Sequence, residues 1–129
     1  MFKRKNIIKI AIDSPAAAGA GTQAKLISKH YNLLQLETGL IYRYIANIKI
    51  REPKKFNYKY LKKKINILKI SSLHNKKLLS DKVATIASII AKDKKIRKLV
   101  HAFQLKCAYN PPKKYAGSCL DGRDICSVI

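Results

Sequence analysis

A run of small residues lies between an apolar stretch and a helical pattern, and its composition suits phosphate binding. The run consists of Ser14, Pro15, Ala16, Ala17, Ala18, Gly19, Ala20, Gly21 and Thr22. A loop of this kind directs backbone N–H groups toward an anion, and the N-terminus of the following helix adds its partial positive charge. The general phosphate-binding loop reads G-x-x-x-x-G-K-[ST], whereas this chain has Ser14 at the first glycine and Ala20 at the lysine. Taken by itself, the run fits a phosphate loop and a simple strand-to-helix turn equally well.

Arginine is rare in this chain, which makes the positions of the arginines informative. Of 28 basic residues, 23 are lysine. The arginines are Arg4, Arg43, Arg51, Arg97 and Arg123. Because guanidinium groups hold phosphates through paired hydrogen bonds, the three that lie inside recognisable local patterns, Arg43, Arg97 and Arg123, are candidates for anion binding. Arg43 and Arg97 fit ordinary surface positions of helices as well.

The elements that must position these residues alternate between strands and helices. We predict strands over residues 6–13, 33–37 and 117–121, and helices over 22–31, from 38 through 48, from 81 through 90 and from 96 through 107. Thr38 is the expected N-cap of its helix, and Pro111-Pro112 ends the last one. The first strand is strongly β-branched and too apolar for an exposed edge, and residues 117–121 are a candidate for a short buried strand. This order predicts an α/β fold with a parallel sheet flanked by helices.

The segment 51–82 has a different character from the rest of the chain. It holds 11 Lys and Arg against two acidic residues, together with Phe56, Tyr58 and Tyr60. We expect an inserted or peripheral segment rather than an element of the core. Aromatic residues among lysines suit the binding of single-stranded nucleic acid, and a solvated surface segment explains the same composition.

Length and composition exclude several classes of protein. A chain of 129 residues with 47% hydrophobic residues suits a single globular domain and not a disordered one. No apolar run approaches the ~20 residues of a membrane span. The three cysteines lack metal-ligand spacing, so we predict no metal cluster and a reduced, cytoplasmic protein. The net charge of +21 favours polyanion binding, although a general lysine bias in composition explains it equally well.

Four stretches resemble motifs of bacterial cytidylate kinases, in the same order. They read IAIDSPAAAGAGTQAK (10–25), LETGLIYR (36–43), VATIASIIA with IRKLVHAFQ (83–104) and LDGRDI (120–125). The resemblance covers about residues 7–47 and 81–129. It implies the N-terminal part of a nucleoside monophosphate kinase of the phosphate-loop class, in one partial domain over 1–129. By the same resemblance, the lysine-rich segment 51–82 corresponds to the subdomain that binds CMP.

The resemblance also implies an activity and roles for individual residues. Such kinases transfer the γ-phosphoryl group of ATP to CMP or dCMP, with Mg²⁺. The run Ser14–Thr22 would bind the ATP phosphates, and Asp13 would lie near the magnesium ion. Residues at the positions that hold CMP are Thr38, Arg43, Ser88, Arg97, Arg123 and Asp124. Arg43, Arg123 and Asp124 are the candidates for catalysis. As alternatives, Ser88 fits simple helix packing and Asp124 fits a turn cap.

Two departures from the family pattern affect what this chain is expected to do. Ala20 replaces the loop lysine, and the loss of one such transition-state contact costs on the order of 2–4 kcal/mol, or about 10²–10³ in rate. Cytidylate kinases also continue beyond this sequence, so we expect a fold that lacks the lid and the last strands. The alternatives are a catalytically silent protein that binds CMP and a basic polyanion-binding protein. We expect nucleotides as partners, no specific nucleic acid, no membrane and a monomer.

Overall fold

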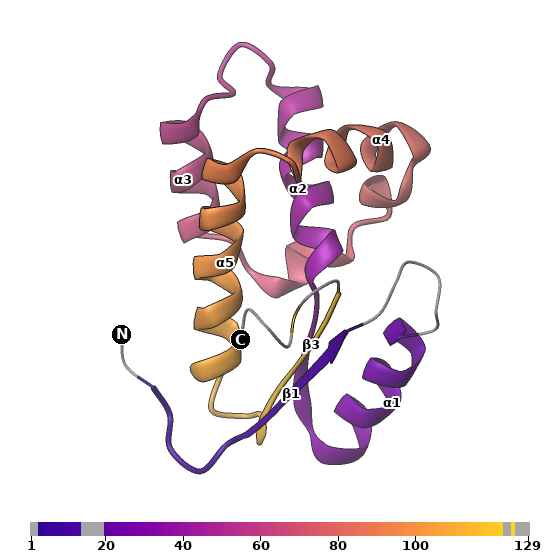
Figure 1. Ribbon diagram of the computed structural model, residues 1–129, viewed down its shortest axis with the longest axis vertical. Coiled ribbons are helices and arrows are strands. Elements are labelled where there is room, and N and C mark those ends of the chain that lie inside the picture. Colours follow the sequence, from indigo (N-terminus) through magenta and orange to yellow (C-terminus); the bar gives the residue numbers. More distant parts are fainter. Residues whose placement is uncertain (1–2, 14–19, 123–124, 126–129) are drawn as a thin grey trace. The chain divides into compact units, whose positions relative to one another are not determined.

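The computed structural model describes residues 3–13, 20–122 and 125 of the chain (Figure 1). Its elements, in order, are β1 (Ile8–Asp13), α1 (Ala20–Tyr31), β2 (Leu33–Glu37), α2 (Thr38–Arg51), α3 (Tyr58–Asn66), the 3-10 helices η1 (Ile70–His74) and η2 (Lys76–Leu79), α4 (Asp81–Ile90), α5 (Lys94–Tyr109) and β3 (Gly117–Gly122). The predicted α/β class is confirmed. Helix α1 begins two residues before the predicted start, and the other predicted strands and helices lie close to their expected bounds.

The three strands form one parallel sheet in the order β1-β3-β2. The last strand in the sequence therefore lies between the first two, and its residues Gly117–Asp121 are all buried. Strand β1 pairs with β3 along its length and is more exposed, with Ile8 40% accessible to solvent. Gly117 is required at its position, because a Cβ atom there would overlap the backbone oxygen of Ile8.

The chain divides into two compact units. Unit 1 comprises Met1–Thr38 and Gln104–Ile129, and unit 2 comprises Gly39–Phe103. In unit 1, α1 packs on one face of the sheet, where Ala24, Leu33 and Cys119 form a buried cluster. The end of α5 lies on the other face, where the Ser118 hydroxyl donates to the Ala108 carbonyl oxygen at 2.8 Å.

An arginine connects the N-terminal segment of unit 1 to the residues that precede β3. The Nη1 atom of Arg4 donates to the carbonyl oxygens of Pro111, Pro112 and Tyr115 at 3.0, 3.0 and 3.1 Å. The backbone N–H of Arg4 also donates to the Tyr109 carbonyl oxygen at 3.0 Å. These bonds satisfy carbonyl groups of an irregular segment and hold Arg4 beside the end of α5.

Unit 2 contains α2 except its first residue, all of α3, η1, η2 and α4, and the first ten residues of α5. The expectation that 51–82 stands apart from the core is wrong, because this segment buries Leu61, Ile65, Leu73 and Leu78. Leu61 and Ile65 are one helical turn apart and share the inner face of α3. Lys62 and Lys63 between them are exposed, so a high charge count does not prevent the helix from packing.

Candidate functional site

The carboxyl ends of the three strands meet at one edge of the sheet in unit 1, because all the strands are parallel. The register places Asp13 beside Gly122 and Glu37 beside Asp121. In α/β proteins, ligands bind outside this edge of the sheet. The predicted phosphate loop follows β1, and the predicted CMP residues Arg123 and Asp124 follow β3 in the sequence. This edge, which we call the carboxyl edge, is the candidate site.

The two ends of the predicted phosphate loop have the expected surroundings. Residues Ser14–Gly19 lie outside the described residues, while β1 ends at Asp13 and α1 begins at Ala20. The strand before the loop and the helix after it are therefore confirmed. A Cβ atom at Gly21 would lie 2.8 Å from the Glu37 Oε1 atom. The start of α1 thus passes close to the end of β2, and a small residue at position 21 permits that approach.

Thr38 and Gly122 lie against each other at the carboxyl edge. The Thr38 side chain is 5% exposed, and its hydroxyl donates to the Asp121 carbonyl oxygen at 3.0 Å. Gly122 has a φ of +154°, and a Cβ atom there would overlap the Thr38 Oγ1 atom. Only glycine is suited to position 122 on both grounds. Thr38 is the first residue of α2, close to the predicted start of that helix, and its hydroxyl forms a hydrogen bond to strand β3.

The buried carboxyl group of Asp121 and the half-buried one of Glu37 lie next to each other at this edge. The Asp121 side chain is 7% exposed, and no donor among the described residues reaches its Oδ1 atom. Burial, and then the negative charge of Glu37, raise the pKa of Asp121 to about 6. Two carboxylates side by side create a negative potential at the edge, and a cation there would relieve it.

The predicted CMP residues of unit 2 lie on three helices. On α2, the half-buried Arg43 donates from Nη1 to the Leu78 carbonyl oxygen at 2.9 Å. On α5, Arg97 is exposed and hydrogen-bonds the phenol of Tyr42, the residue before Arg43. Burial raises the pKa of Tyr42, and the charge and hydrogen bond of Arg97 oppose that rise. The structure thus brings Arg97 to the segment of α2 that carries Arg43.

The remaining predicted residues are placed differently. Ser88 is exposed on α4, and its hydroxyl donates to the Thr85 carbonyl oxygen at 2.7 Å within the same helix. Arg123 and Asp124 lie outside the described residues. Two features had no predicted role, the Glu37–Asp121 pair in unit 1 and, separately, Tyr42 in unit 2. In the sequence, the pair could have been predicted from the position of both acidic residues at the ends of strands. The Tyr42–Arg97 hydrogen bond could not, because it depends on how the two helices pack.

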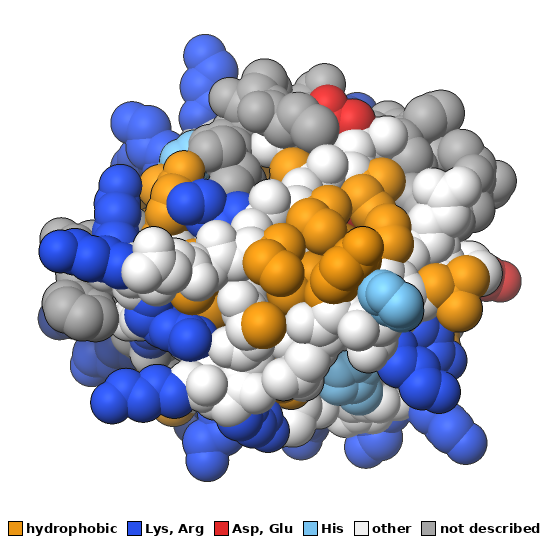
Figure 2. Space-filling view, turned by 90° about the horizontal axis from the view of Figure 1, so that it is seen from below, with side chains coloured by type: hydrophobic (Ala, Val, Ile, Leu, Met, Phe, Trp, Pro, Cys, Tyr) orange, Lys and Arg blue, Asp and Glu red, His pale blue; other side chains and the backbone are white. Residues whose placement is uncertain are grey.

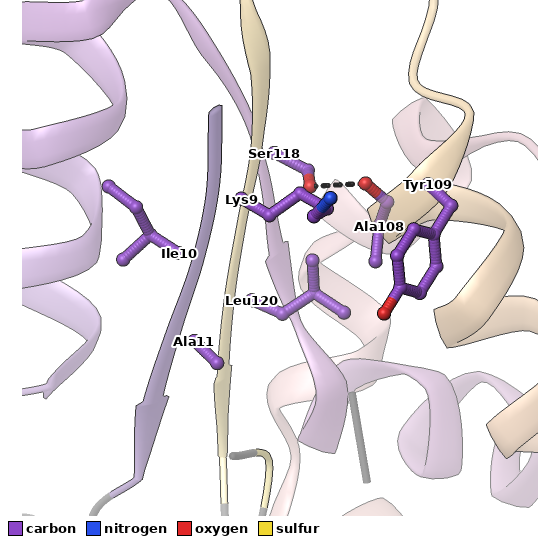
Figure 3. A pocket seen from close by; sticks show the side chains of 7 residues that line it. All are labelled: Lys9, Ile10, Ala11, Ala108, Tyr109, Ser118 and Leu120. Carbon is purple, nitrogen blue, oxygen red and sulfur yellow. Dashed lines mark hydrogen bonds between the residues drawn. The ribbon is translucent and has the colours of Figure 1, made fainter. Parts of the chain in front are cut away.

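A pocket of about 200 Å³ lies on the face of the sheet toward the end of α5, away from the carboxyl edge. Figure 3 shows Lys9, Ser118 and Leu120 on this side of the sheet, facing Ala108 and Tyr109. The Lys9 Nζ atom lies 4.9 Å from the Tyr109 ring centroid. The pocket is smaller than the ~300–1,000 Å³ of most ligand pockets, and none of the predicted site residues lines it.

The part of the chain that the structure describes has neither a cluster of metal-ligating side chains nor a membrane-spanning helix. No three of its His, Cys, Asp and Glu side chains gather as they would around a metal ion. None of its helices combines the length and the hydropathy that crossing a bilayer requires.

Comparisons with known proteins give one consistent family. A family model described as cytidylate kinase matches residues 10–129. The cytidylate kinase of Bradyrhizobium sp. (strain ORS 278) is 38% identical over 121 residues, which cover 93% of this chain and 55% of that protein. The cytidylate kinase of Bartonella quintana (strain Toulouse) is 38% identical over 125 residues, covering 93% and 54%.

A relative with a second activity in its name matches as well. The bifunctional pantoate ligase/cytidylate kinase of Prochlorococcus marinus (strain MIT 9301) is 35% identical over 147 residues, covering all of this chain and 27% of that protein. The chain spans about half the length of the single-function relatives that it matches. Because the family model covers nearly the whole sequence, and the matched segments include every motif described above, the chain belongs to the cytidylate kinase family.

Proposed function

We propose that this chain binds CMP or dCMP and ATP at the carboxyl edge, and that its activity is the transfer of the γ-phosphoryl group to the monophosphate. The observation that carries the proposal is the parallel register, which aligns Asp13 with Gly122 and Glu37 with Asp121. The predicted ATP loop and the predicted CMP segment both leave the sheet there. Membership of the cytidylate kinase family supports the choice of substrates.

Positioning and charge neutralisation are what such a transfer requires of the protein. In this proposal the segment Ser14–Thr22 binds the ATP phosphates through backbone N–H groups, with the N-terminus of α1 directed at them. The close approach of Gly21 to Glu37 supports this arrangement, because it brings the first turn of α1 to the carboxyl edge. Ala20, the first residue of α1, supplies no cation there.

The monophosphate would be held by Thr38, Arg43, Ser88, Arg97, Arg123 and Asp124. Arg43 is already oriented by one bond to the Leu78 carbonyl oxygen, and its guanidinium group has four further N–H donors. The Tyr42 phenol orients Arg97 in the same way. Because both side chains are held before a ligand arrives, less conformational entropy is lost when a phosphate binds.

The carboxylate pair fits the magnesium ion that accompanies ATP. Mg²⁺ is usually held by one or two carboxylates together with substrate phosphates and water. The buried Asp121 Oδ1 atom, with no donor among the described residues, and the adjacent Glu37 offer such oxygens. When bound, the ion would neutralise phosphate charge. The chain's own part is to hold these two carboxylates at the end of adjacent strands.

A second candidate function is the binding of CMP without turnover, and Ala20 is the observation that favours it. A missing loop lysine weakens the stabilisation of the transferred group and leaves the monophosphate contacts unchanged. Both candidates share the same CMP site, so they are separated by turnover and not by CMP affinity.

The test uses the full chain, with calorimetric titration of CMP, dCMP, UMP and ATP–Mg²⁺ and a separate assay of ADP release. We expect CMP to bind, and Ala20→Lys to raise ADP release by about 10²–10³ with unchanged CMP affinity. Gln23→Lys, which adds the same charge at an exposed position of α1, is the matched control and should change neither. If wild type and Ala20→Lys both bind CMP and neither releases ADP, the second candidate function is supported. A folded sample that does not bind CMP would contradict both candidate functions.

A further inference from the structure

The basic residues are unevenly divided between the two units. Unit 2 has 18 Lys and Arg against three acidic residues, whereas unit 1 has ten against four. The face drawn in Figure 2 also has many more Lys and Arg than acidic side chains, around a patch of hydrophobic ones, and the division between the units comes from the sequence. A general lysine bias would give the two units similar numbers of basic residues. The concentration in unit 2 therefore calls for an explanation based on that unit's own surface.

The exposed face of α3 carries three neighbouring lysines. Lys59, Lys62 and Lys63 are exposed and have the spacing of residues on one side of a helix, opposite the buried Leu61 and Ile65. Like charges three and four residues apart repel each other, and a lysine in the first turn opposes the helix dipole. The first turn of α3 has no acidic residue. A polyanion on this face would relieve both effects.

An exposed aromatic ring adjoins these lysines. Tyr58, the first residue of α3, is 44% exposed. The Lys95 Nζ atom of α5 lies 5.9 Å from its ring centroid, which places the first turns of α3 and α5 next to each other. Figure 1 shows the two helices side by side. We call the five residues Tyr58, Lys59, Lys62, Lys63 and Lys95 the α3 surface.

The carboxylates of unit 2 have roles elsewhere in the unit. Glu52 accepts a hydrogen bond from the Tyr60 phenol at 2.5 Å. Asp93 accepts from the backbone N–H groups of Lys95 and Ile96 at 2.9 and 3.2 Å, and so caps α5. Asp81 lies in the first turn of α4. Three acidic residues engaged in this way leave most of the positive charge of the unit unneutralised.

We propose that the α3 surface binds single-stranded nucleic acid without reading its sequence, with phosphates on the three lysines of α3 and a base stacked on Tyr58. The exposed ring favours unpaired bases, which offer a face for stacking. Lysines neutralise phosphates but lack the guanidinium fork that reads guanine. A membrane is disfavoured because the apolar residues Leu61 and Ile65 of this helix are buried within unit 2. The proposal does not depend on the proposed kinase activity.

The test is fluorescence anisotropy of a labelled 12-nucleotide oligo(U) or oligo(dT), titrated with the full chain from 50 to 300 mM KCl. For single strands, log K falls with log [salt] by about 0.7 per neutralised phosphate. The triple substitution K59Q/K62Q/K63Q should therefore reduce the magnitude of this slope by about 2 and weaken binding at least tenfold at 100 mM salt. Tyr58→Leu should weaken binding about tenfold and leave the slope unchanged.

The matched control removes three exposed lysines of unit 1, K5Q/K29Q/K113Q, and should leave the slope nearly unchanged. An equal reduction in both triple variants would overturn the proposal, since binding would then follow net charge alone. A duplex or an anionic vesicle bound as tightly as the single strand, with no effect of Tyr58→Leu, would also overturn it. Circular dichroism melts establish that each variant is folded.

Discussion

Asp121→Asn is expected to stabilise the protein at neutral pH, which is unusual for a buried residue in a family motif. The carboxyl of Asp121 is buried beside Glu37, and its pKa is raised from an ordinary 3.8 to about 6. An acid whose folded-state pKa is raised favours folding when protonated. Its contribution to stability is full below about pH 4 and is lost as the pH rises through 6. At pH 7 the folded protein therefore contains an unfavourable charge.

The magnitude follows from the two pKa values. A difference of about two pH units corresponds to about 3 kcal/mol at about 1.4 kcal/mol per unit. Glu37 is only half-buried, and water and salt near it screen the pair, so we expect roughly half of this, about 1–2 kcal/mol. For a chain of this size that is a rise in Tm of roughly 3–8 °C. Burial is the larger cause of the raised pKa, so Glu37→Gln should give a smaller rise than Asp121→Asn.

Thermal denaturation followed by circular dichroism, from pH 4 to pH 7.5, measures this difference. The Tm of Asp121→Asn minus that of wild type should be small at pH 4 and reach its maximum near pH 7. Asp81→Asn is the control, because Asp81 is exposed and favourably placed in the first turn of α4, so its loss should be slightly destabilising. A Tm difference that is the same at pH 4 and pH 7, or a lower Tm for Asp121→Asn at pH 7, would refute the reasoning.

Three further predictions concern the fold of unit 1 and its neighbourhood. Gly122→Ala should lower the free energy of unfolding, measured with urea, by about 2–4 kcal/mol, because φ of Gly122 is positive and the Thr38 side chain occupies the position of a Cβ atom. Gly39→Ala, at a position with open space around it, should not lower this free energy. Arg4→Ala should lower stability by about 2 kcal/mol, since three carbonyl oxygens of residues 111–115 lose a charged donor; an unchanged Tm would contradict this. Burial raises the pKa of Cys107 to about 12, which leaves a thiolate fraction of about 10⁻⁴ at pH 8; peptide mass spectrometry should find it unlabelled by a thiol reagent until urea unfolds the chain.

Much of the secondary structure could be predicted from local sequence. The β-branched run that ends at Asp13 and the apolar run before Glu37 form strands as expected, and the periodic apolar residues of α4 and α5 form helices. These signals are local, because side-chain period and capping residues act within a few positions. The segment 51–82 was mispredicted for the same reason. Two apolar residues among many lysines are enough to bury one side of a nine-residue helix, but they are too few for a visible pattern.

The candidate site could be predicted in part. Its residue types follow from the motifs, and the small residue at position 21 and the glycine at 122 have the surroundings that the motifs require. The pairing of Glu37 with Asp121 depends on β3 lying between β1 and β2, and no local pattern encodes strand order. The bond between Tyr42 and Arg97 likewise joins two helices far apart in the sequence. Packing decides such contacts, and a single sequence does not reveal packing.

The position of β3 between the other strands has a consequence for the order of folding. Unit 2 is a continuous segment of 65 residues, Gly39–Phe103, and can acquire its structure while the ribosome is still adding the residues after Phe103. Strands β1 and β2 must wait, because each pairs with β3 and not with the other. The nearer pairing joins Leu33 to Gly117 and the farther one joins Ile8 to Gly117. Each requires a loop closure over most of the chain, which slows folding. During synthesis the apolar segments of both early strands therefore stay unpaired, and chaperones that recognise extended hydrophobic peptides should bind this protein at β1 and β2 before β3 emerges.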